Sequence, residues 1–119
     1  MTDFVIGNVI RSQIVEDYLD FFENKNVEAI SDILSVDCTL TDWNVGTIKG
    51  KEVIMAFFTE MFDSVGDIEV NVSHIHEDMD GILICEMALS LDKKEFLVAD
   101  IFEFNQEDQI KALRAYKGN

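Results

Sequence analysis

The hydrophobic pattern of the chain changes its period near residue 68. Before this point, apolar residues mostly recur every three or four positions, as on one face of an α-helix. After it, they alternate with polar residues, as along a β-strand, and short polar turns separate the segments. Helices grouped before strands predict an α+β fold with an antiparallel sheet and argue against a parallel βαβ sheet.

The first helical segment runs from Val9 to Glu23, where Ile10, Ile14, Tyr18 and Phe22 follow one another at intervals of four residues. This spacing places them on one side of a helix, so Tyr18 is predicted to face the core.

A second, shorter helix is predicted to begin after Asn26 and to run through Ile33 and Leu34. The side-chain oxygen of Asn26 can accept from a free N–H of the first turn, and Glu28 suits the positive end of the helix. The first two helices should pack as a hairpin.

A strand and a third helix complete the first half. Cys38, Leu40 and Asp42 alternate with polar or solvent-facing residues as far as Trp43, which predicts a strand followed by a loop from Asn44 to Lys49. After Gly50 an apolar stripe indicates a third helix that ends before Gly66 and covers a sheet. The stripe consists of Val53, Ile54, Phe57, Phe58, Met61 and Phe62.

The second half predicts four strands joined as an antiparallel meander. At 119 residues, with no proline, repeat or linker, the chain has the size of one domain, residues 1–119. The strands are Ile68 to His76, Ile82 to Leu91, Glu95 to Phe104 and Gln109 to Tyr116.

The charge of the chain excludes polyanionic partners. Nine basic residues against 24 acidic ones give a net charge of −15, which repels nucleic acid and anionic membranes. The first ten residues lack the pattern of a signal peptide, and no segment is apolar enough to span a membrane. We expect a cytoplasmic protein.

Cysteine and histidine offer little chemistry in this pattern. Cys38 and Cys85 stand far apart and fit no disulfide framework, so they are expected to be reduced and buried. His74 and His76 are two residues apart and are predicted on the face shared with Val70 and Val72. No third metal ligand is evident, which favours a dimer contact or pocket lining over a metal site.

Asp100 is the most unusual position in the sequence. In its predicted strand it shares a face with large apolar residues, Val98 and Phe102 nearest. Desolvation there should raise its pKa, and a neutral carboxyl group donates a hydrogen bond. The alternative is a structural Asp that is satisfied by a nearby hydroxyl or backbone N–H.

Asp42 and Tyr18 are further inward-facing candidates. An ionised Asp42 near the mouth of a cleft could take a proton from a carbon acid, or its side chain could instead satisfy the backbone of the following loop. Tyr18 could be an ordinary core aromatic with a hydrogen-bonded hydroxyl.

Three segments, IVEDYLDFFENKNVEAISDILSVDCTLTDWNVG, IKGKEVIMAFFTEMF and FLVADIFEFNQEDQIKALRAY, carry a family resemblance over nearly the whole chain. They resemble the NTF2-like superfamily, and within it the ketosteroid isomerases and SnoaL-like polyketide cyclases. The resemblance implies a cone of curved antiparallel sheet, capped by helices around an apolar pocket and commonly assembled as a homodimer.

The resemblance also implies roles for residues. Ketosteroid isomerases use a Tyr on the first helix, a general-base Asp after the first strand and an oxyanion-binding Asp on a late strand, which match Tyr18, Asp42 and Asp100. Trp43 stands where the isomerases have proline, and Phe58 where some have a supporting Tyr. We expect the substrate contacts to come from Trp43, Phe58, Val98 and Phe102.

These features predict an isomerase that moves a proton next to the carbonyl of a hydrophobic compound without a cofactor. There are two alternatives. One is a SnoaL-like cyclase that closes a ring by an aldol reaction, and the other is a non-catalytic module that binds a small molecule. A homodimer through the outer face of the sheet is also expected, because both faces of the strand from Ile82 to Leu91 carry apolar residues.

Overall fold

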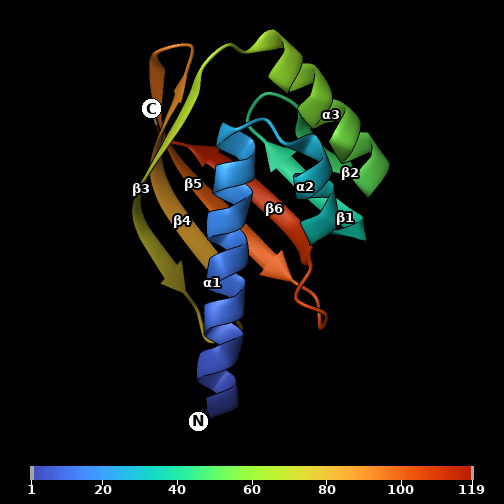
Figure 1. Ribbon diagram of the computed structural model, residues 1–119, viewed down its shortest axis with the longest axis vertical. Helices are drawn as coiled ribbons and strands as arrows, with labels where there is room; N and C mark the ends of the chain where they lie inside the picture. The colour runs from blue at the N-terminus through green and yellow to red at the C-terminus, as the bar shows by residue number, and fades with distance from the viewer. Residues whose placement is uncertain (1, 119) are drawn as a thin grey trace.

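The computed structural model describes the backbone of residues 2–118 and the side chains of residues 9–118. Three helices and six strands follow the order expected for an α+β fold, with the helices in the first half of the chain (Figure 1). The elements are α1 Thr2–Glu23, α2 Val27–Ile33, β1 Leu34–Asp42, β2 Gly46–Lys49, α3 Lys51–Ser64, β3 Ile68–Glu77, β4 Leu83–Leu91, β5 Lys94–Phe104 and β6 Ile110–Lys117.

The strands form one curved, open sheet in the order β2-β1-β6-β5-β4-β3. The meander of β3, β4, β5 and β6 is antiparallel, as predicted. The sheet is nevertheless mixed, because β1 pairs with β6 in parallel. Helix α3 connects β2 at one edge of the sheet with β3 at the other edge, and the meander then returns strand by strand until β6 lies beside β1.

All three helices cover one face of the sheet. Helix α1 contacts β3 and β4, α3 contacts β1 and β2, and α2 packs against the other two helices. In Figure 1, α1 lies in front of the middle of the sheet while α2 and α3 lie over the end formed by β1 and β2. The helices and the concave face of the sheet therefore enclose the interior, and none of the described helices lies over the opposite face.

The core consists of the helical stripes and the inward-facing residues of the strands. Val15, Ile30 and Ile54 come from the three helices, and Leu83 and Phe102 from the sheet; all five are almost fully buried. Alternation along β5 buries every second residue from position 98 onward, as the pattern predicted.

Helix α1 contacts the sheet through polar side chains at two positions, one near each end of the part whose side chains are described. Arg11 forms an ion pair of 2.8 Å with Asp108 in the β5–β6 turn and stacks over the ring of Phe104. Near the other end, Glu23 Oε2 accepts from the N–H of Val70 at 2.7 Å. These contacts fix the height and rotation of the helix, and with them the position of Tyr18.

Several element boundaries differ from the sequence-based expectation. Helix α1 begins at Thr2 and not at Val9, since no proline interrupts it and extending a formed helix costs less than starting one. The predicted loop from Asn44 to Lys49 contains β2, which pairs with β1 as a hairpin. A segment of four residues with a single large apolar side chain, Ile48, is too short to show alternation, so pairing with β1 makes it a strand.

A β-bulge in β3 changes the placement of the two histidines. Val72 pairs with Met87, but the next pair is His74 with Glu86, so Ser73 is an extra residue. His74 and His76 therefore lie on the outer face of the sheet, away from the helices. The prediction that they share a face with Val72 was wrong, because one extra residue reverses the facing of every residue after it.

None of the described helices is long and apolar enough to cross a membrane. Both cysteines, Cys38 and Cys85, are free and buried, as expected. Burial raises the pKa of the Cys85 thiol to about 12, with the carboxyl groups of Asp100 and Glu86 adding to the rise. A thiol of this kind is a poor nucleophile at neutral pH.

Candidate functional site

A pocket of about 440 Å³ lies between the helices and the concave face of the sheet. Its wall is mainly apolar, and α1, β1, α3, β4, β5 and β6 all contribute to it. The size and lining suit a small hydrophobic ligand held by a few polar groups. Those polar groups include Tyr18, Asp42 and Asp100, which line this one pocket from three different elements.

Tyr18 projects from α1 and is 4% exposed. Its ring packs edge-on against Phe102 at 5.4 Å and Phe58 at 6.4 Å, measured between ring centroids, and tilts against Phe22 at 6.0 Å. Burial, and next the carboxyl group of Asp100, raise the pKa of Tyr18 well above 10. The hydroxyl group therefore stays protonated at neutral pH and is available as a donor.

Asp100 lies on the inner face of β5 between Val98 and Phe102, and pairs across the sheet with Cys85. It is 7% exposed. Burial raises the pKa of Asp100 from 3.8 to about 7, and the nearby Asp42 carboxyl adds to the rise. The apolar surroundings predicted from the strand pattern thus produce a carboxyl group that is largely protonated in slightly acidic solution.

Asp42 is the last residue of β1 and is partly exposed. Its Oδ2 accepts from the N–H of Asn44 at 2.8 Å, so the side chain does satisfy the turn that follows, as one interpretation of the sequence held. The same residue lines the pocket. The turn therefore holds the carboxyl group at the pocket wall.

Tyr18 and Asp100 retain unused hydrogen-bonding capacity. Among the described residues, no side-chain hydrogen bond joins either group to the protein, and no fully buried polar side-chain atom lacks a partner. The polar atoms of both residues must therefore open on to the pocket, where a ligand or water can reach them.

Of the four expected substrate contacts, Trp43, Phe58 and Val98 line the pocket. Phe102 is fully buried and supports the ring of Tyr18 from behind, so its influence on a ligand is indirect. Trp43 also packs against Phe96, with ring centroids 6.1 Å apart.

The sequence-based reasoning missed polar pocket residues on α3. Glu60 and Ser64 line the pocket together with Met61. Both residues flank the apolar stripe of this helix. Polar residues beside such a stripe are normally exposed to solvent, so the sequence pattern alone did not identify them as pocket residues.

A curved open sheet capped by helices over an apolar pocket is the fold that this chain shares with NTF2-like proteins of known structure. Within the NTF2-like superfamily the chain belongs to the SnoaL-like domain family, which matches residues 15–113. No curated protein sequence matches the chain significantly.

Solved structures support the same fold. A SnoaL-like protein from Burkholderia thailandensis is similar with a TM-score of 0.83 and 14% identity, over 93% of this chain and 97% of that one. SalBIII, an epoxide hydrolase/cyclase-like enzyme of pyran ring formation in salinomycin, is similar with a TM-score of 0.79 and 18% identity, over 91% of this chain and 90% of that one. An LEH-like epoxide hydrolase from M. tuberculosis is similar with a TM-score of 0.76 and 22% identity, over 89% of this chain and 80% of that one.

Proposed function

We propose that the pocket binds a hydrophobic carbonyl compound and moves a proton at the carbon next to the carbonyl group. The observation that carries this proposal is the convergence of Tyr18, Asp42 and Asp100 on one largely apolar pocket. Tyr18 is a protonated donor, and Asp100 is one in slightly acidic solution. Among the described residues neither side chain has a hydrogen-bond partner, and the third group, Asp42, is a carboxyl group held by a turn. Such a set fits general-base chemistry beside an oxyanion site.

In the proposed reaction, Asp42 takes the proton as the C–H bond breaks, and the electron pair moves on to the carbonyl oxygen. Tyr18 and neutral Asp100 donate hydrogen bonds to the resulting enolate oxygen. Asp42 then returns the proton to a different carbon, so atoms and charge balance without a cofactor. Donors placed in this way are worth roughly 3 kcal/mol each, and a positioned base about 10²- to 10⁴-fold in rate.

The proposal carries a pH dependence. Asp100 can donate only while it is protonated, and its pKa is raised to about 7. Turnover should therefore fall as pH rises through about 7, because the donor becomes a second anion beside the enolate.

The test is isomerisation of a β,γ-unsaturated ketone, whose conjugated product absorbs in the ultraviolet. Asp42→Asn should lower kcat by about 10²-fold or more, since it removes the base. Binding of 2-naphthol, a planar phenol that resembles the enolate, should stay nearly unchanged in this variant. Asp100→Asn, which keeps a donor, should retain more activity than Asp100→Leu.

Glu60→Gln is the matched control, because Glu60 is a carboxyl group at the same pocket without a proposed role. Equal turnover by wild type and Asp42→Asn would overturn the isomerase. Binding of 2-naphthol without any turnover would instead favour a binding module.

A second candidate is the opening of an epoxide by water or by a hydroxyl group of the substrate. The observation that favours it is the pair of carboxyl groups at one pocket: Asp100, with a pKa of about 7, and Asp42 both line it. Two of the similar structures, SalBIII and the M. tuberculosis protein, are named as epoxide hydrolase-like enzymes. Asp100 would protonate the oxygen as the C–O bond breaks, while Asp42 takes the proton of the attacking hydroxyl.

Styrene oxide and a long-chain epoxide, in water enriched in ¹⁸O, test this candidate. Diol formation that depends on both Asp42 and Asp100, with no isomerisation of the ketone, would select epoxide opening. An aldol cyclase would use the same base, and would instead convert an open-chain diketone to a ring.

We also propose that two copies of the chain associate through the outer face of the sheet, which is left uncovered by the helices that the structure describes. Leu97 and Tyr116 are 54% and 49% exposed on this face. Tyr116 pairs with Ala99, which lies on the same face of β5 between Leu97 and the partly exposed Ile101. Exposed apolar surface of this kind is typical of a contact between subunits.

A further inference from the structure

Three metal-ligating side chains meet on the outer face of the sheet, on the side opposite the pocket. His74 and His76 project from β3, and Glu86 from β4, directly opposite His74. Strand β3 is the edge of the sheet, so the group lies at the rim of the outer face. Because Ser73 is an extra residue in β3, the strand changes its facing there, and both histidines face outward beside Glu86.

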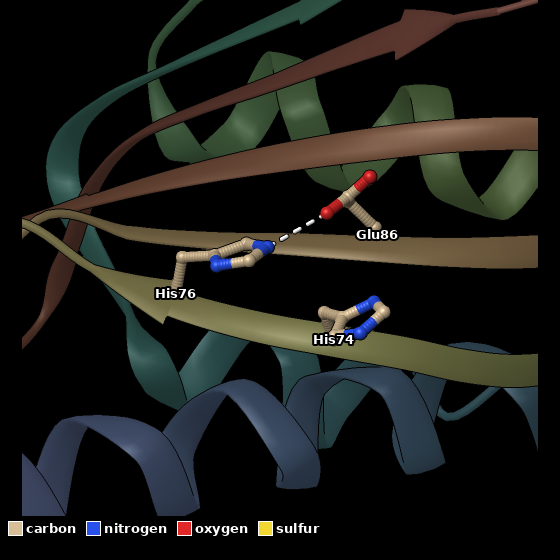
Figure 2. Close-up of side chains that lie close together, drawn as sticks. All are labelled: His74, His76 and Glu86. Atoms are coloured by element: carbon tan, nitrogen blue, oxygen red, sulfur yellow. Dashed lines mark hydrogen bonds and ion pairs between the residues drawn. The ribbon is translucent and has the colours of Figure 1, made fainter.

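The three side chains are close enough to share one ion. One ligand atom from each residue lies within 4.8 Å of the other two. His76 Nε2 and Glu86 Oε2 are 2.7 Å apart, and the two imidazole rings stack with centroids 5.7 Å apart and planes 16° apart (Figure 2). Figure 2 shows the carboxyl group and both rings projecting to the same side of β3 and β4.

We propose that His74, His76 and Glu86 bind a zinc ion. Zinc binds imidazole nitrogen and carboxylate oxygen at about 2.0–2.2 Å in a tetrahedron, which places neighbouring ligand atoms about 3.4 Å apart. The distance of 2.7 Å between His76 Nε2 and Glu86 Oε2 is below that separation, and the ligand atoms of all three residues lie within 4.8 Å of one another. Since His76 and Glu86 are about half exposed, small side-chain rotations suffice.

The chemistry of the ligands selects among cations. Two imidazoles with one carboxylate suit zinc and similar transition metals, whereas Mg²⁺ and Ca²⁺ prefer oxygen ligands alone. Three protein ligands leave a fourth position for water or another molecule. The net charge of −15 also raises the local concentration of cations at the surface.

Binding of zinc would join the edge strand to its neighbour where the bulge interrupts their pairing. Between Val72 and His74 the register shifts, so this part of β3 has fewer regular contacts with β4. An ion that binds only the folded chain raises the melting temperature. The site lies outside the pocket, so this inference does not depend on the proposed function.

The test uses untagged protein freed of metal by a chelator, because a histidine tag would bind zinc itself. Competition with a chromogenic zinc indicator should give one zinc ion per chain. His74→Gln, His76→Gln and Glu86→Gln should each weaken zinc binding by about tenfold or more. The chain has only two histidines, so the imidazole nitrogen NMR signals report directly on both proposed ligands.

Glu69→Gln is the matched control, because Glu69 is exposed on the outer face of the same strand and carries the same charge. This variant should bind zinc like the wild type, and excess Mg²⁺ should not displace the ion. Circular dichroism checks that each variant is folded. Equal zinc affinity for wild type and the three ligand variants, displacement by Mg²⁺, or unchanged imidazole signals would each overturn the proposal.

Discussion

At the scale of single residues, environment separates two carboxyl groups of the same type. Asp100 is enclosed by the apolar inner face of β5, whereas Asp42 stands at the end of a strand with a backbone N–H to satisfy. Alternation along the strand is enough to predict the first environment. The sequence offered the second environment as one of two interpretations of Asp42, and the hydrogen bond from the N–H of Asn44 shows it.

Asp100→Asn should stabilise the protein more at pH 8 than at pH 5. The folded-state pKa of Asp100 lies at about 7, above the ordinary Asp value of 3.8, so its contribution to wild-type stability is fully present below 3.8 and is lost as pH rises to and through about 7. Each pKa unit corresponds to about 1.4 kcal/mol. Asparagine has no charge to bury, and we expect its melting temperature at pH 8 to exceed the wild-type value by roughly 4 °C or more.

Thermal unfolding at pH 5, 6, 7 and 8 measures this difference. Asp63→Asn, at an exposed position of α3, is the control and should show no such trend. A difference between Asp100→Asn and wild type that is the same at all four pH values would contradict the role of burial.

At the scale of elements, the best-predicted feature is the start of α2. The Asn26 side chain accepts from the N–H of Ala29 at 3.1 Å, with Glu28 in the first turn, as the sequence indicated. A cap is a local interaction between residues three apart, so it can be read from the sequence. The strand β2 and the bulge at Ser73 depend on partners far along the chain, and they were missed for that reason.

Asn26→Ala should lower the free energy of unfolding by about 1 kcal/mol, because the N–H of Ala29 loses its acceptor. Asn26→Asp keeps an acceptor oxygen and should remain close to wild type. Urea unfolding followed by circular dichroism compares the variants. A loss as large in Asn26→Asp as in Asn26→Ala would mean that the acceptor oxygen at this position is not the source of the stability.

At the scale of the whole molecule, one face of the sheet is covered by helices and the other is not. We expect a dimer in solution at micromolar concentration, measured by small-angle scattering. Leu97→Glu should shift the molecule towards the monomer, because it places a charge in the apolar contact.

Met79→Glu is the control for that substitution. Met79 is a fully exposed apolar residue in the β3–β4 turn, outside the proposed contact, and its replacement should leave the mass unchanged. A wild-type protein that scatters as a monomer would remove the dimer from consideration.

The sequence by itself determined what depends on neighbours along the chain. This part includes the helices, the meander after residue 68, the cap at Asn26 and the apolar surroundings of Asp100, since periodicity and local hydrogen bonding act over a few residues. Only the tertiary structure decided the parallel pairing of β1 with β6, the strand β2 and the outward turn of His74 beside Glu86. Those features arise from pairing between distant segments, and one extra residue in a strand is enough to move a side chain from one face of the sheet to the other.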